Sequence, residues 1–226
     1  MKKSSINGSL TALCVAGVLG TAGAARAVTM YSLDSPNTAI SGYAGPYGSV
    51  SVSLVDNTHA NIMFTSLVNG GNIYLFGDGG SVDVNVNATS WLLSGITGNN
   101  SGTGFTLGGP FTDGGSGNVS AFGVLNQTIN TFDGFSHSSD TISFMLENTS
   151  GTWANDASVL TPNADGISAA AHIFVTSSPA NKANGAIVTG FAGDGGGSTF
   201  MPDGGSTLAL TGLAVAALVS LRRKVC

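Results

Sequence analysis

The chain has 226 residues, 34 of them glycine, and a formal charge of −5 at pH 7. The span 28–201 holds eleven of the twelve acidic residues but only one of the seven basic residues, Lys182, so its formal charge is −10. So acidic a span repels phosphate backbones, which excludes nucleic acid as a partner. Both cysteines, Cys14 and Cys226, lie outside this span, so we expect it to be stabilised by packing without a disulfide.

Residues 1–27 have the pattern of a secretory signal peptide. Lys2 and Lys3 precede an apolar stretch at 10–20, and an A-x-A cleavage sequence ends at Ala27. The sequence therefore predicts export by the general secretion machinery and cleavage by signal peptidase. The residues of the cleavage site are Ala25, Ala27 and Val28.

Residues 28–192 are expected to form β-strands throughout, because apolar and polar residues alternate in several short runs. The predicted strands are 49–55, 62–68, 72–76, 81–87, 119–129, 141–147, 172–176 and 186–191. Glycine-rich turns such as Asn69-Gly70-Gly71 and Gly77-Asp78-Gly79-Gly80 separate them, since glycine tolerates the positive φ that tight turns need. This spacing predicts an all-β fold, a single antiparallel β-sandwich or jelly-roll-like domain.

Two glycine-rich segments interrupt the predicted strands. Residues 93–117 are rich in Gly, Asn, Ser and Thr, and we expect them to form a long loop from which Phe105, Leu107 and Phe111 fold back onto the sandwich. Residues 193–200 are expected to be a flexible spacer that lets the following segment reach a membrane.

The last 26 residues, 201–226, have the order of a C-terminal sorting signal. A turn-like motif is followed by the apolar run Leu208–Leu221 and then by three basic residues. The run has 14 residues, or 18 when counted from Gly204, against the roughly 17–25 that span a bilayer, so we expect a membrane-spanning helix across a thin bilayer. The basic residues Arg222, Arg223 and Lys224 predict a cytoplasmic C-terminus.

The motif Met201-Pro202-Asp203-Gly204-Gly205 resembles the PEP-CTERM class of exosortase sorting signals, in its Val-Pro-Asp-Ser-Gly variant. Met201 stands where valine is usual, and Gly204 stands where serine is usual. The resemblance implies recognition by an exosortase-type membrane enzyme and cleavage near Pro202-Asp203. It also implies a membrane-anchored intermediate, followed by delivery to the cell surface or the extracellular matrix.

No catalytic residues and no cofactor are predicted. The three histidines lie in separate segments without the spacing of a zinc site, and no G-x-S-x-G sequence is present. Asp78 and Asp83, with Asp113 and Asp133 as further candidates, could bind Ca²⁺, although none fits the spacing of an EF-hand loop.

Aromatic residues offer one indication of a ligand. Trp91, Trp153 and Tyr74, together with Tyr43 and Tyr47, could form a face on which sugar rings stack, or they could belong to the core.

Three functional hypotheses follow from the sequence. The leading one is a non-catalytic structural or interaction protein of the cell surface or of an exopolysaccharide-containing, biofilm-associated matrix. The second is a carbohydrate-binding module for extracellular polysaccharide. The third is a secreted hydrolase whose active site is assembled from dispersed residues.

Overall fold

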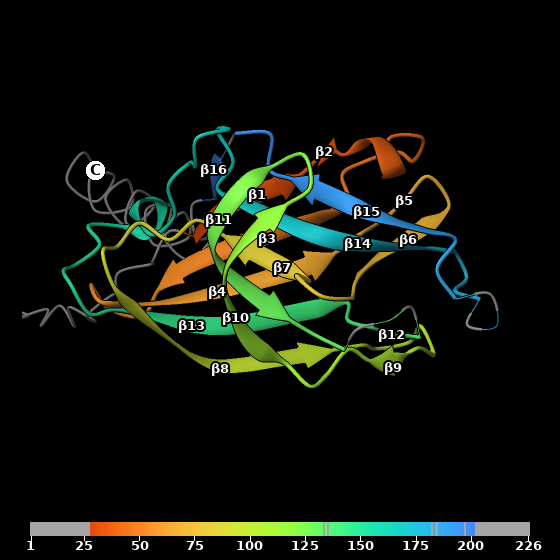
Figure 1. The fold of residues 1–226 in the computed structure, drawn as a ribbon, viewed down its shortest axis with the longest axis horizontal. Coiled ribbons are helices and arrows are strands. Elements are labelled where there is room, and N and C mark those ends of the chain that lie inside the picture. Colours follow the sequence, from red (N-terminus) through yellow and green to blue (C-terminus); the bar gives the residue numbers. More distant parts are fainter. Residues whose placement is uncertain are drawn as a thin grey trace, which may run out of the picture. The chain divides into compact units, whose positions relative to one another are not determined.

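The computed structural model describes residues 28–132, 134, 136–181, 183, 185–196 and 198–201, which all belong to one unit, Arg26–Gly204. These residues form two antiparallel β-sheets that pack face to face (Figure 1). No α-helix occurs in the part of the chain that the structure describes. The prediction of an all-β antiparallel sandwich is therefore confirmed.

The first sheet has six strands. Their order is β16 (Ser198–Met201), β1 (Val28–Leu33), β3 (Gly48–Leu54), β4 (His59–Ser66), β13 (Thr141–Asn148) and β8 (Trp91–Asn99). Every neighbouring pair in it is antiparallel.

The second sheet is built around a long central strand, β14. Its order is β10 (Thr112–Val119), β11 (Gly123–Asn130), β7 (Val82–Val84), β14 (Ala169–Ser177), β15 (Val188–Gly193) and β2 (Ser35–Pro36). On the side of β14 that pairs with β7, β6 (Asn72–Phe76) continues the sheet and pairs in turn with β5 (Val68–Asn69).

Four short elements complete the described fold. Strands β9 (Thr106–Leu107) and β12 (His137–Ser138) form a small parallel pair. Two 3₁₀ turns, η1 (Thr38–Ile40) and η2 (Asp156–Ser158), connect larger strands.

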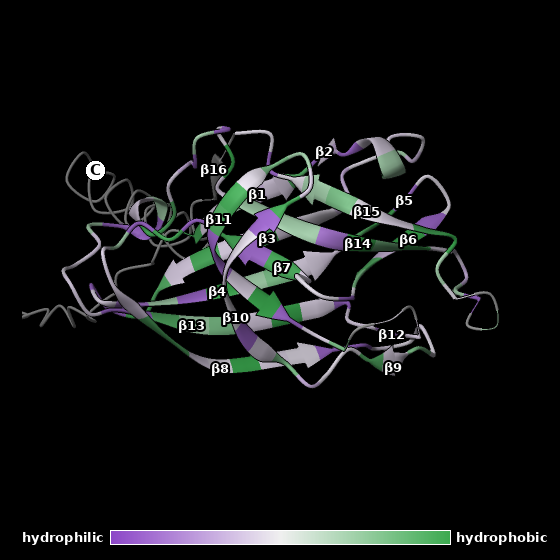
Figure 2. Ribbon diagram, in the orientation of Figure 1, coloured by the Kyte–Doolittle hydropathy of each residue, from purple (hydrophilic) through white to green (hydrophobic). Residues whose placement is uncertain are grey.

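Alternation along the strands builds the core between the sheets (Figure 2). In β13, for example, every second residue is buried, and Ile142, Phe144 and Leu146 all face inward. The ring of Phe64 in β4 lies 6.0 Å from the ring of Phe76 in β6, edge to face, which joins the two sheets directly. Burial of each such side chain contributes about 1.5–3 kcal/mol, so this shared cluster holds the sandwich together.

The central strand β14 is buried on both faces. Ile173 and Val175 belong to the core between the sheets, whereas Ala170 and Phe174 belong to two separate apolar clusters on the opposite side. The turn of the β10–β11 hairpin, with Phe122, covers Ala170, and Phe105 packs edge to face on Phe174 at 5.0 Å. The outer face of the second sheet is therefore covered rather than open to solvent.

Each of the eight predicted strands overlaps an observed strand, although the prediction 119–129 includes the β10–β11 turn and 81–87 is shortened to β7, but the predicted loop at 93–117 is wrong. This segment forms most of β8 and β10, together with β9. Bulges accommodate its glycines: Gly95 in β8 and Gly115 in β10 both have φ of +62° and lie where the pairing register shifts. Of the three apolar residues expected to fold back, Phe105 is buried and Phe111 packs on the core, whereas Leu107 is exposed.

The predicted flexible spacer at 193–200 is also corrected. Gly193 ends β15, and residues 198–201 form β16, which pairs with β1 so that Met201 lies opposite Val28. Gly195 and Gly196 form a turn between β15 and β16, and their φ values of +56° and +80° are ones that glycine adopts readily. The sheet therefore continues to the first residue of the sorting motif.

We predict that replacement of Gly98 by alanine destabilises the domain. A Cβ atom at Gly98 would overlap the ring of Phe111, which packs against β8 at this point. Overpacking of this kind costs about 1–3 kcal/mol, measurable as a lower urea midpoint. Gly42→Ala is the control, since a Cβ there meets nothing within 4 Å. Equal midpoints for the two variants would show that Phe111 does not pack on β8.

Candidate functional site

The β10–β11 hairpin encloses a hollow on the outer face of the second sheet. The hollow has a volume of about 280 Å³. Its lining comes from four strands, β7, β10, β11 and β15, and from the turn before β7. The lining residues are Gly79, Gly80, Asp83, Gly114, Gly117, Asn118, Val119, Thr128, Asn130 and Phe191. We call this site the Asp83 hollow.

Asp83 is the most deeply buried polar residue of the hollow, with 1 % of its surface exposed. Strand pairing places it between Thr128 of β11 and Ala170 of β14. The Thr128 hydroxyl donates a hydrogen bond of 2.6 Å to Oδ1 of Asp83, whereas Oδ2 has no partner among the described residues. Burial raises the pKa of Asp83 to about 7, against the opposing effect of the Thr128 hydrogen bond.

Glycines allow β10 to lie close over these polar groups. A Cβ atom at Gly117 would stand 2.7 Å from Oγ1 of Thr128, and one at Gly114 would stand 2.7 Å from Nδ2 of Asn130. A larger residue at either position would push the hairpin away from β11. The glycines of β10 therefore allow this strand to pack closely over the polar side chains of β11.

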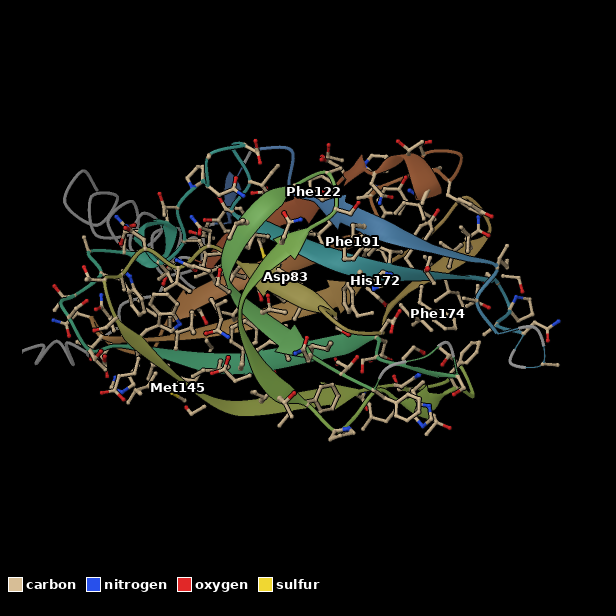
Figure 3. The ribbon with its side chains drawn as sticks, in the orientation of Figure 1. Asp83, Phe122, Met145, His172, Phe174 and Phe191 are labelled. Atoms are coloured by element: carbon tan, nitrogen blue, oxygen red, sulfur yellow. The ribbon has the colours of Figure 1, made fainter. Side chains whose placement is uncertain are left out.

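An aromatic pair borders the hollow on the side of β15. The ring of Phe191 stacks on His172 of β14 with ring centroids 4.2 Å apart and an interplanar angle of 16°. Figure 3 shows both side chains beside Asp83. Burial lowers the pKa of His172, and the carboxylate of Asp78, 3.9 Å from Nδ1, partly opposes this effect.

The structure brings the predicted calcium candidates Asp78 and Asp83 to the same region without completing a metal site. Asp78, in a turn with φ of +70°, accepts hydrogen bonds from the backbone amides of Gly79 and Gly134. Asp113 accepts from the side chain of Gln127 instead. Among the described residues no group of three or more His, Cys, Asp or Glu side chains could hold a metal ion. Asp133 lies outside the described residues.

The predicted stacking face of Trp91, Trp153 and Tyr74 is not formed. Tyr74 is fully buried and donates from its hydroxyl to the carbonyl of Ala44, and Trp153 is 2 % exposed. Trp91 is half-buried, and its Nε1 donates to Gln127 across the two sheets at 2.8 Å. The alternative interpretation, that these rings belong to the core, is the one that the structure supports.

The other titratable cluster lies in the exposed turn between β3 and β4. Nδ1 of His59 lies 3.0 Å from Oδ1 of Asp56, and its Nε2 lies 3.8 Å from Oε2 of Glu147. Hydrogen bonds, first from the backbone amide of Thr58 and then from His59, hold the pKa of Asp56 well below its usual range. This carboxylate closes the turn, so the cluster has an evident structural role.

Sequence patterns did not identify Thr128, Asn118, Asn130 or Phe191 as parts of a site. They come from three strands and share no motif or spacing, and only the curled hairpin brings them together. The one sequence feature that could have indicated this site is the pair of glycines at 114 and 117. Glycine within a strand often marks a place where another part of the chain or a ligand approaches the backbone closely.

The fold and the C-terminal sequence together define an exported β-sandwich protein with a C-terminal sorting signal. The particular signal is the VPDSG-CTERM motif, whose family model matches residues 202–225. This motif is a variant of the PEP-CTERM-like sorting signals, so the resemblance noted in the sequence is confirmed. No curated protein and no solved structure matches the chain.

The remaining predicted processing residues divide between the described and the undescribed parts of the chain. Val28 begins β1 and Met201 ends β16. The other residues, Ala25, Ala27, Pro202, Asp203, Gly204, Gly205, Arg222, Arg223 and Lys224, lie outside the described residues, as does the apolar run 208–221. Within the described part of the chain, no helix has the length and hydropathy needed to cross a membrane.

We predict that Asp83 makes the stability of the domain depend on pH. Folding raises the pKa of this carboxyl from 3.8 to about 7, so the folded state binds more protons than the unfolded state between these values. The free energy of unfolding should therefore fall as the pH rises from about 4 to about 7, by up to about 4 kcal/mol from this group.

Urea unfolding at pH 5 and pH 8 tests this prediction with Asp83→Asn as the comparison. The variant should lose most of the decrease, because asparagine does not titrate. Asp194, whose pKa is also raised by burial, remains in both proteins and cancels in the comparison. The same pH dependence in both proteins would contradict the assignment.

Proposed function

We propose that this chain is an exported protein whose β-sandwich is delivered to the cell surface or to an exopolysaccharide-containing extracellular matrix, where it acts as a non-catalytic structural or interaction domain. The observation that carries the proposal is the VPDSG-CTERM match at residues 202–225. The match begins one residue after β16 ends, so the signal follows the sandwich directly.

The tail suits the successive steps of sorting. The apolar run 208–221 and the basic residues 222–224 would hold a membrane-anchored intermediate with its domain outside. Pro202 disfavours a helix at the motif, which suits binding by a membrane processing enzyme of the exosortase type. Cleavage near Pro202-Asp203 then separates the sandwich from its anchor.

The Asp83 hollow supports a binding role better than a hydrolytic one. Glycoside hydrolysis generally uses two carboxyl groups that flank the scissile bond. Asp83 is the single carboxylate among the described residues that line the hollow. The acidity of the domain, with its formal charge of −10 over residues 28–201, also suits a protein that stays soluble outside the cell by self-repulsion.

The double substitution Pro202→Ala and Asp203→Ala should block sorting. We expect an unprocessed precursor in the membrane fraction, while the parent protein appears shortened in the surface or matrix fraction. Cell fractionation followed by intact-mass measurement of each form checks this result and also determines both mature ends.

Ser220→Ala, within the tail but outside the Pro-Asp motif, is the matched control and should be processed normally. Release of the double variant at the size of the processed parent would show that the motif is not recognised, and the proposed delivery would then be wrong.

A further inference from the structure

We propose that the Asp83 hollow binds one uncharged sugar residue, which deepens the proposed function by giving the exported sandwich a ligand. The proposal rests on the proposed function only for the source of that sugar, an extracellular polysaccharide. The binding itself follows from the groups that the hairpin gathers in the hollow (Figure 3).

The polar groups of the hollow match sugar hydroxyls. Asp83 lies deepest, and its Oδ2 is a buried acceptor with no partner among the described residues. Asn130 is half-buried, and its Oδ1 accepts from the amide of Gly80, which orients its Nδ2 donor. Asn118 is exposed at the rim. A carboxylate that accepts and amides that both donate and accept can bond adjacent hydroxyls, each of which is donor and acceptor.

An apolar surface accompanies these polar groups. Phe191 lines the hollow, and its stacking on His172 fixes the orientation of the ring. Sugar rings present C–H faces that pack on aromatic rings while their hydroxyls make hydrogen bonds at the edge. Ligand pockets generally combine an apolar lining with a few placed polar groups in this way.

The charge and size of the hollow further restrict the class of ligand that it can bind. No lysine or arginine is among the described residues that line it, so an anionic ligand such as a phosphate or a uronate would meet Asp83 without a compensating cation. Its volume of about 280 Å³ lies just below the range of ligand pockets, which begins near 300 Å³. This space suits one ring rather than a peptide segment.

A divalent cation is the competing ligand, because Asp78 and Asp83 are the candidates for Ca²⁺ that the sequence offers. Ca²⁺ takes six to eight oxygen ligands, commonly several of them carboxylates. Asp83 is the one carboxylate among the described residues of the lining, and Oδ1 of Asp78 already accepts the backbone amides of Gly79 and Gly134. The observations therefore favour the sugar, and Ca²⁺ becomes an outcome of the test.

The experiment titrates the full chain with the methyl glycosides of glucose, galactose, mannose and N-acetylglucosamine. The protein is held in a detergent without a sugar headgroup, so that the detergent cannot compete. Binding is followed by saturation-transfer NMR, and we expect a dissociation constant on the order of 1 mM for at least one glycoside.

Two variants alter the hollow by different means. Asp83→Asn replaces the two carboxylate acceptors at the bottom by one acceptor and one donor, and it keeps the shape of the side chain. Gly79→Leu places a side chain at the rim, where a Cβ atom meets nothing within 4 Å, so the fold tolerates it. Each should weaken binding at least tenfold. The matched controls Asp34→Asn and Gly42→Leu, at exposed positions outside the lining, should bind as the parent does.

Failure of all four glycosides to bind would overturn the proposal, as would unchanged binding in both Asp83→Asn and Gly79→Leu. Calcium titrated alone is the third arm. Binding of Ca²⁺ that is lost in Asp83→Asn, without sugar binding, would replace the sugar site by a cation site. Because these measurements use purified protein, their failure leaves the cell-fraction test of sorting unaffected.

Discussion

The burial of β14 on both faces is the constraint on which the rest of the domain depends. One face completes the core between the sheets, and the other would expose Ala170 and Phe174 unless further chain covered them. The β10–β11 hairpin and the segment around Phe105 provide that cover. A hairpin that must curl over a sheet cannot lie flat on every side chain beneath it, and the Asp83 hollow is the space that remains.

The sequence predicted eight of the strands but not this cover, and the difference has a physical cause. Alternation in 81–87 correctly separates Val82 and Val84, which face the core, from Asp83, which faces outward. On an open sheet an outward aspartate would be solvated and ionised. Here β10 buries it, and its pKa rises to about 7. Periodicity gives the face of a sheet on which a residue lies, whereas burial depends on distant segments that periodicity does not report.

The same limit explains the two corrected segments and the aromatic residues. The many glycines in 93–117 and 193–200 are typical of loops. Several of them instead occupy bulges and turns of the paired strands, as Gly95 and Gly115 do. Trp153 and Tyr74 could have been surface or core by sequence alone. Their polar atoms find backbone carbonyl partners inside the domain, at Asn87 and Ala44, and this makes their burial possible.

The pairing of β1 with β16 links the fold to export. Val28, the first residue after the predicted signal-peptide cleavage site, lies opposite Met201, the first residue of the sorting motif. In an antiparallel pair this register puts the start of one strand and the end of the other at the same end of the sheet. Both predicted cleavage positions therefore lie next to the same end of the first sheet. An enzyme that cut near Pro202 would therefore act next to the last residues of β16, where the first sheet ends.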